Sequence, residues 1–189
     1  MRKKKREVVT GRLDINKKLE VDDILLKHRV LFLTDEIKAE NMAKLIKEIF
    51  VLDALNHEPI KLYINSQGGS VSAGFSLINT IKLIKSPVYT IVTGEACSMA
   101  GLISIAGKQR FMTKNTFWMT HDMRGGIEGD YSGKVEHRAE AIKKMWKMIE
   151  NHLKTHTKLS DKELETARNG ELWLSPEECL EKGIINKIL

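Results

Sequence analysis

Three short blocks of the chain contain residue types that together could perform serine-dependent acyl transfer. Residues 64–71 (INSQGGSV) form a glycine-rich turn, residues 94–101 (GEACSMAG) contain Ser98, and residues 119–121 end on His121. Acyl transfer needs backbone N–H donors for the oxyanion, an activated nucleophile and a general base. The turn, the serine and the histidine would supply these three parts in that order.

Ser98 is expected at the start of a helix, where the exposed backbone amides carry partial positive charge and would stabilise an oxyanion. Its neighbours are small (Gly94, Ala96, Ala100 and Gly101), so a substrate could approach. A purely structural N-cap serine would produce the same local pattern. The pattern alone favours neither interpretation.

The glycine pair of the first block also allows two interpretations. Gly68 and Gly69 could simply provide a strand-to-helix turn that requires positive φ. Alternatively, the N–H of Gly69 and that of Met99 donate to the oxyanion, a contribution that typically changes a rate by ~10²–10³.

The third block stands out among six histidines because only His121 ends an apolar, strand-like run. His137, His152 and His156 are expected on, or just after, the polar side of a long helix. No histidine pair with a carboxylate suggests a metal site, and HExxH is absent from the sequence. The sequence therefore predicts no metal.

The residues after His121 are too rich in glycine for a helix. Residues 124–129 (RGGIEG) could form an exposed edge strand that binds an extended peptide by β-augmentation, or a flexible loop.

Hydrophobic periodicity predicts that strands and helices alternate, with a mostly parallel sheet built by right-handed βαβ crossovers. Ligands bind such sheets at the carboxyl ends of the strands, where the glycine turn and Ser98 would both lie. A heptad-like apolar seam over 135–153 predicts a long helix, and Ser175-Pro176 begins another that Gly183 ends. The earlier elements are expected as strands at 30–33, 60–64, 88–92, 111–112 and 117–119 and helices at 40–55, 71–85 and 98–106.

The composition is that of an ordinary globular protein. The 189 residues carry a net charge of +6, but five positive charges are consecutive at residues 2–6, which is typical of a solvated arm. No secretory signal, membrane-spanning stretch or nucleic-acid-binding signature is found in the sequence. Two cysteines without metal spacing favour a reducing, cytoplasmic setting.

From about Leu25 to Ile188 the chain resembles the family of Clp protease proteolytic subunits (ClpP). Residues 25–34 resemble its first-strand block, residues 63–69 its YINSPGG turn, and residues 94–101 its GxAASMG nucleophile block. Met119-Thr120-His121 followed by Gly125-Gly126 resembles the family's base and the start of its handle.

The resemblance implies an α/β, crotonase-like fold of repeated β-β-α units with a protruding strand–helix handle at about 122–155. Residues 21–189 would form the peptidase domain and residues 1–20 a basic axial arm. It also implies two stacked seven-membered rings of identical subunits, fed with unfolded polypeptides by an AAA+ ATPase, and no cofactor. The implied roles are Ser98 as nucleophile, His121 as base, Gly69 and Met99 as oxyanion hole, and Ser70, Val71, Gly125 and Gly126 as peptide-binding residues.

The chain departs from the family pattern in four places. Gln67 replaces a proline, the segment between Ser98 and His121 is two residues shorter, and the N-terminus is basic rather than apolar. The fourth departure concerns the third member of the triad. Counting back from Leu174-Ser175 without gaps places Ala167 there, and a two-residue shift selects Asn169, which we favour because its amide oxygen can accept the imidazole N–H. Other candidates for this role are Asp122, Asp161 and Glu165.

These observations predict a Clp-type serine endopeptidase. Two alternatives stay open at this point: a catalytically impaired ring subunit, and a crotonase-like acyl-CoA enzyme that needs no serine nucleophile.

Overall fold

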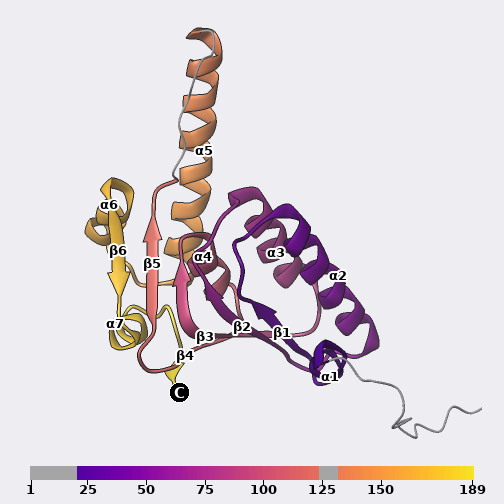
Figure 1. Cartoon of the computed structure of the whole chain (residues 1–189). Coiled ribbons are helices and arrows are strands. Elements are labelled where there is room, and N and C mark those ends of the chain that lie inside the picture. The colour runs from indigo at the N-terminus through magenta and orange to yellow at the C-terminus, as the bar shows by residue number, and fades with distance from the viewer. Residues whose placement is uncertain (1–20, 124–131) are drawn as a thin grey trace, which may run out of the picture.

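The structure is a computed structural model that describes residues 21–123 and 132–189. The basic arm at residues 1–20 lies outside these ranges. Gly125 and Gly126, which were predicted to bind peptide, also lie outside them. The described chain forms a twisted sheet with helices packed against it, and one long helix projects from the body (Figure 1). The first helix, α1 (Val21–Lys27), was not expected from the sequence.

The main sheet is parallel, as the alternating pattern predicted, and its strand order is β1-β2-β3-β4-β7. Helices α2, α3 and α4 make the connections between its early strands. The strands are β1 (Val30–Leu33), β2 (Ile60–Ser66), β3 (Val88–Cys97), β4 (Gln109–Met112) and β7 (Lys187–Ile188), and the helices are α2 (Ala39–Leu55), α3 (Val71–Leu83) and α4 (Met99–Ser104).

Strand β3 is long enough to pair with two different strands on one side. Its residues 89–92 pair with β4, whereas residues 95–97 pair with β5 (Phe117–His121). Strand β6 (Glu171–Leu174), which the sequence analysis did not predict, pairs antiparallel with β5. The sheet therefore divides beyond β3, and the branch made of β5 and β6 carries His121.

The C-terminal region contains α5 (Ser132–His156), α6 (Asp161–Asn169) and α7 (Pro176–Glu181). Helix α6 was not expected, although Ser160 and Glu163 form a capping box at its start. The predicted capping box at Ser175 is confirmed, and Gly183 adopts φ 65° after α7.

Helix α5 packs against the body along its lower half. Trp146, Ile149 and Leu153 are buried there, and the upper half projects from the body (Figure 1). His152 is only 6% exposed. The expectation that it lies on the polar side of this helix is therefore wrong, because that turn of α5 packs against α4 and α3 rather than facing solvent.

Candidate active site

Ser98 occupies a strained position between β3 and α4. It has φ 54° and ψ −122°, and positive φ in a non-glycine residue costs about 1–3 kcal/mol. Its N–H donates to the Met119 carbonyl at 2.8 Å, which ties it to the strand that carries His121. Its hydroxyl makes no capping hydrogen bond, so the side chain does not perform the structural N-cap role considered above.

The glycine turn lies directly against this serine. A Cβ on Gly68, which has φ 98°, would be 2.6 Å from the Cys97 carbonyl oxygen and 2.9 Å from the Ser98 Cβ. Only glycine allows the turn to approach so closely.

Gly69 is held by the residues on either side of it. Ile37 donates its N–H to the Gly68 carbonyl and accepts from the Ser70 N–H, both at 2.8 Å. In this parallel bridge the N–H and C=O of Gly69 point away from Ile37. The Gly69 amide is therefore available on the side opposite Ile37.

One pocket of about 670 Å³ brings most of the predicted site residues together. Ser98, His121, Gly69 and Met99 all line it, as do Ser70 and Val71. Its other walls are formed by Gln67, Ser72, Leu102, Thr120, Met123, Ile142, Met145 and Ile149. Met99 is the first residue of α4, so its N–H is one of the amides that a helix leaves without an internal partner.

No hydrogen bond joins the Ser98 hydroxyl to the His121 ring within the described ranges. Catalytic hydrogen bonds are often long in unliganded enzymes and shorten when substrate binds. The structure thus shows Ser98 and His121 at one pocket without a hydrogen bond between their side chains.

Asn169, the expected third triad member, is the exposed last residue of α6 and is not among the residues that line the pocket. Glu171 instead is the cross-strand partner of His121 in the antiparallel pair of β5 and β6. Directly opposite residues have Cβ atoms about 4.5–5.5 Å apart, within reach of a carboxylate–imidazole contact. The Trp173 indole N–H donates to Glu171 Oε2 at 2.9 Å.

Two of the other three candidates for the third member make polar contacts elsewhere. Asp122 accepts from the Met123 N–H at 2.7 Å, and Asp161 pairs with Lys154 at 3.0 Å. Glu165 is exposed on α6. Sequence reasoning missed Glu171 because β6 was not recognised as a strand; its pairing with β5 is the signal that identifies this residue.

Cys97, next to Ser98, is not a competing nucleophile. Burial, together with Glu95 and Glu171, raises the pKa of its thiol to about 12. The thiolate is the reactive form of cysteine, so at neutral pH this side chain is inert.

Neither a metal centre nor a membrane span is apparent in the part of the chain that the structure describes. There, no group of three or more His, Cys, Asp and Glu side chains could hold a metal ion. No helix in the same ranges is long and apolar enough to cross a bilayer.

The fold and the site define an α/β enzyme of the serine acyl-transfer class. The Clp protease family matches residues 15–189. The ATP-dependent Clp protease proteolytic subunit of Streptococcus mutans is 36% identical over 170 residues, which cover 87% of this chain and 86% of that protein. The chain therefore belongs to the Clp protease family, and it is a serine endopeptidase.

Proposed function

We propose that Ser98 attacks the carbonyl carbon of a peptide bond while His121 accepts the hydroxyl proton. The tetrahedral oxyanion receives hydrogen bonds from the N–H groups of Gly69 and Met99. His121 then returns the proton to the leaving amine, and water hydrolyses the acyl-enzyme by the same route. The observation that carries this proposal is the single pocket that all four residues line.

Glu171, rather than Asn169, is our proposed third member. A carboxylate stabilises the imidazolium that forms when His121 takes the proton and holds the ring in the productive tautomer. Neither residue lines the pocket, but Glu171 lies directly opposite His121 in the pair of β5 and β6, which supports this role, whereas Asn169 ends α6.

The substrate is proposed to bind as an extended strand along Ser70 and Val71 on one side, with Gly125 and Gly126 on the other. Ser70 and Val71 line the pocket beside Gly69, which supports their part. The apolar side chains of Leu102, Ile142 and Ile149 line the same pocket and suit an unfolded polypeptide.

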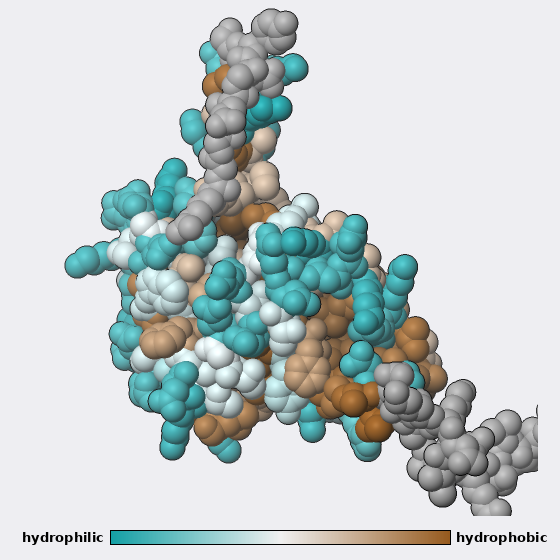
Figure 2. All heavy atoms as spheres, viewed as in Figure 1, coloured by the Kyte–Doolittle hydropathy of each residue, from teal (hydrophilic) through white to brown (hydrophobic). Residues whose placement is uncertain are grey.

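The protein is proposed to act as a homo-oligomer of two stacked heptameric rings, fed by an AAA+ Clp ATPase in the cytoplasm. The relative from Streptococcus mutans is named a subunit of an ATP-dependent protease. Hydrophobic surface gathers at the end of the molecule that α1 occupies (Figure 2), where Val21, Ile24 and Phe32 are exposed. Such surface is typical of an interface. Both cysteines are buried thiols, which fits a reducing compartment.

The test is covalent labelling of the assembled protein by a fluorophosphonate, followed by peptide mapping. We expect one label, on Ser98, and loss of both labelling and peptide hydrolysis in Ser98→Ala. Absence of labelling in the wild-type protein, with no difference between it and Ser98→Ala, would instead indicate an impaired ring subunit.

A further inference from the structure

The short helix α4 carries the nucleophile at one end, and its opposite end is held by side chains from four different elements. Helix termini leave carbonyls without internal partners, and a short helix that positions a catalytic group needs them satisfied. The donors are Trp118 on β5 (to Gly101 O, 3.2 Å), His152 on α5 (to Leu102 O, 2.9 Å), Thr90 on β3 (to Ser104 O, 2.6 Å) and Arg110 on β4 (to Ile105 O, 3.3 Å).

The bond from His152 reaches a residue that is itself hydrogen-bonded to the nucleophile residue. The Leu102 N–H donates to the Ser98 carbonyl at 3.2 Å, so residue 102 is one helical turn from the nucleophile. Its own carbonyl has no helical donor, because the Ala106 N–H bonds to the Ile103 carbonyl instead. The imidazole of His152 therefore satisfies a buried acceptor that the helix itself leaves open.

The hydrogen bond to Leu102 fixes which ring nitrogen of His152 carries a proton. A carbonyl oxygen can only accept, so Nε2 of His152 must carry the proton that is donated to Leu102. The ring is held between α3 and the next turn of α5. The Phe75 ring meets it edge-on with a centroid distance of 6.1 Å, and the centroid of the His156 ring lies 4.4 Å from that of His152.

His152 also connects α4 with the wall of the pocket. Ile142, Met145 and Ile149 of α5 line the pocket, and His152 follows on the next turn of the same helix. Three of the four donors come from the sheet, and His152 is the one that comes from the helix contacting substrate space.

We propose that His152 is a positioning residue. Its N–H donates to the Leu102 carbonyl, and this bond fixes the position of α4, which carries Met99 and follows Ser98, relative to the wall of the pocket that α5 forms. This inference rests on the proposed function. Removing the bond leaves Leu102 O buried and unsatisfied, and α4 relaxes by a small shift. A shift of about 1 Å at a catalytic group can cost up to ~10²-fold in rate.

The test compares three variants with wild type in the assembled protein. His152→Phe keeps a ring against Phe75 and removes the donor, His152→Leu removes ring and donor, and His152→Gln keeps an uncharged N–H donor of similar reach. The readouts are the rate of fluorophosphonate labelling at Ser98, kcat and KM for an unfolded protein substrate, and sedimentation to verify assembly.

We expect His152→Phe to label about tenfold more slowly or worse, with kcat reduced more than KM is raised, and His152→Gln to stay within about threefold of wild type. If His152→Phe does not assemble, His152→Leu provides the same comparison. Wild-type rates in an assembled variant that lacks the donor would overturn the inference, as would a Gln variant that is as slow as the Phe variant. These results differ from failure of the proposed function, in which the wild-type protein itself is not labelled.

Discussion

At the scale of the residue, the choice between Glu171 and Asn169 has the largest chemical consequence. Glu171→Gln keeps the side-chain size and removes the charge that would stabilise the His121 imidazolium. In the serine-protease template, the equivalent loss of a carboxylate costs about 10⁴ in kcat. We expect a decrease of at least 10² here, measured as kcat for peptide hydrolysis.

Asn169→Ala is the matched control for that experiment. Asn169 is exposed at the end of α6, so its truncation should leave kcat within about twofold of wild type, because exposed side chains away from a site contribute little. A large loss in Asn169→Ala with an unchanged Glu171→Gln would reverse our assignment.

The glycine turn gives a second prediction at this scale. A Cβ on Gly68 would collide with the Cys97 carbonyl, so Gly68→Ala must push the turn away from Ser98 and separate the two oxyanion donors. The expected loss in kcat is about 10²–10³, the usual effect of losing one such donor.

Gly170→Ala is the control, since a Cβ there would lie 3.7 Å from its nearest neighbour, the Thr166 carbonyl. Equal kcat values for the two variants would show that the close approach at Gly68 does not matter for catalysis.

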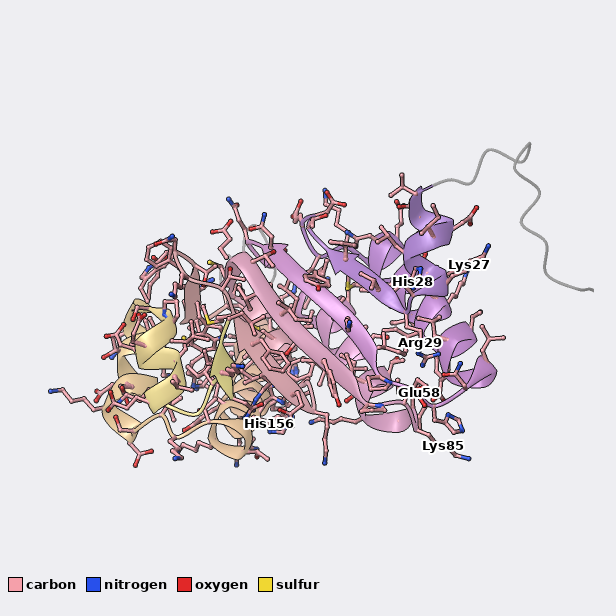
Figure 3. All side chains as sticks on the ribbon, turned by 90° about the horizontal axis from the view of Figure 1, so that it is seen from below. Lys27, His28, Arg29, Glu58, Lys85 and His156 are labelled. Carbon is pink, nitrogen blue, oxygen red and sulfur yellow. The ribbon has the colours of Figure 1, made fainter. Side chains whose placement is uncertain are left out.

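At the scale of the element, the lower end of α5 contains a group of basic side chains with consequences for stability. His152 and His156 pack against each other, and Lys82 of α3 and Arg110 of β4 add positive charge around them. Arg110 also donates to the His156 carbonyl at 2.9 Å. His156 ends α5, well away from Arg29, Glu58 and Lys85 (Figure 3).

Burial, followed by the charges of His156 and Lys82, lowers the pKa of His152 from 6.5 to about 4. The unfolded chain therefore binds a proton at this residue before the folded chain does. The free energy of unfolding should fall as the pH drops from about 6.5 towards 4, by roughly 3 kcal/mol from this group. Urea unfolding midpoints measured at several pH values would report this decrease.

His152→Gln should make that pH dependence shallower, because glutamine does not titrate while its amide can still donate to Leu102. An identical slope in the wild-type protein and the variant would contradict this source of the acid sensitivity.

At the scale of the whole molecule, the exposed apolar surface predicts self-association. Val51 and Leu55 lie one turn apart on α2 and are 52% and 71% exposed. Large apolar side chains exposed side by side, such as Val51 and Leu55, are stabilised when another subunit covers them. Leu55→Lys should therefore shift sedimentation towards smaller species.

Thr166→Lys introduces the same charge at an exposed polar position on α6 and should leave sedimentation unchanged. Unchanged sedimentation of Leu55→Lys would exclude this face of α2 from the assembly.

The sequence by itself determined the order of most elements, and it predicted the central residues of the proposed site. Alternating strand and helix patterns predicted the parallel sheet, because periodicity reflects which face of each element is buried. The glycine pair and the serine were expected at strand ends, and both are found there, since crossover connections of one hand place those ends on a common edge.

Only the tertiary structure decided the features that depend on pairing between distant segments. The four residues of β6 are too short to show a period, so neither the strand nor the position of Glu171 opposite His121 could be predicted locally. The burial of His152 was missed for a similar reason: its polarity suggested solvent, whereas a carbonyl left open at the end of α4, fifty residues away in the chain, provides its partner. Local sequence determines which elements form, but contacts between elements determine which polar groups meet.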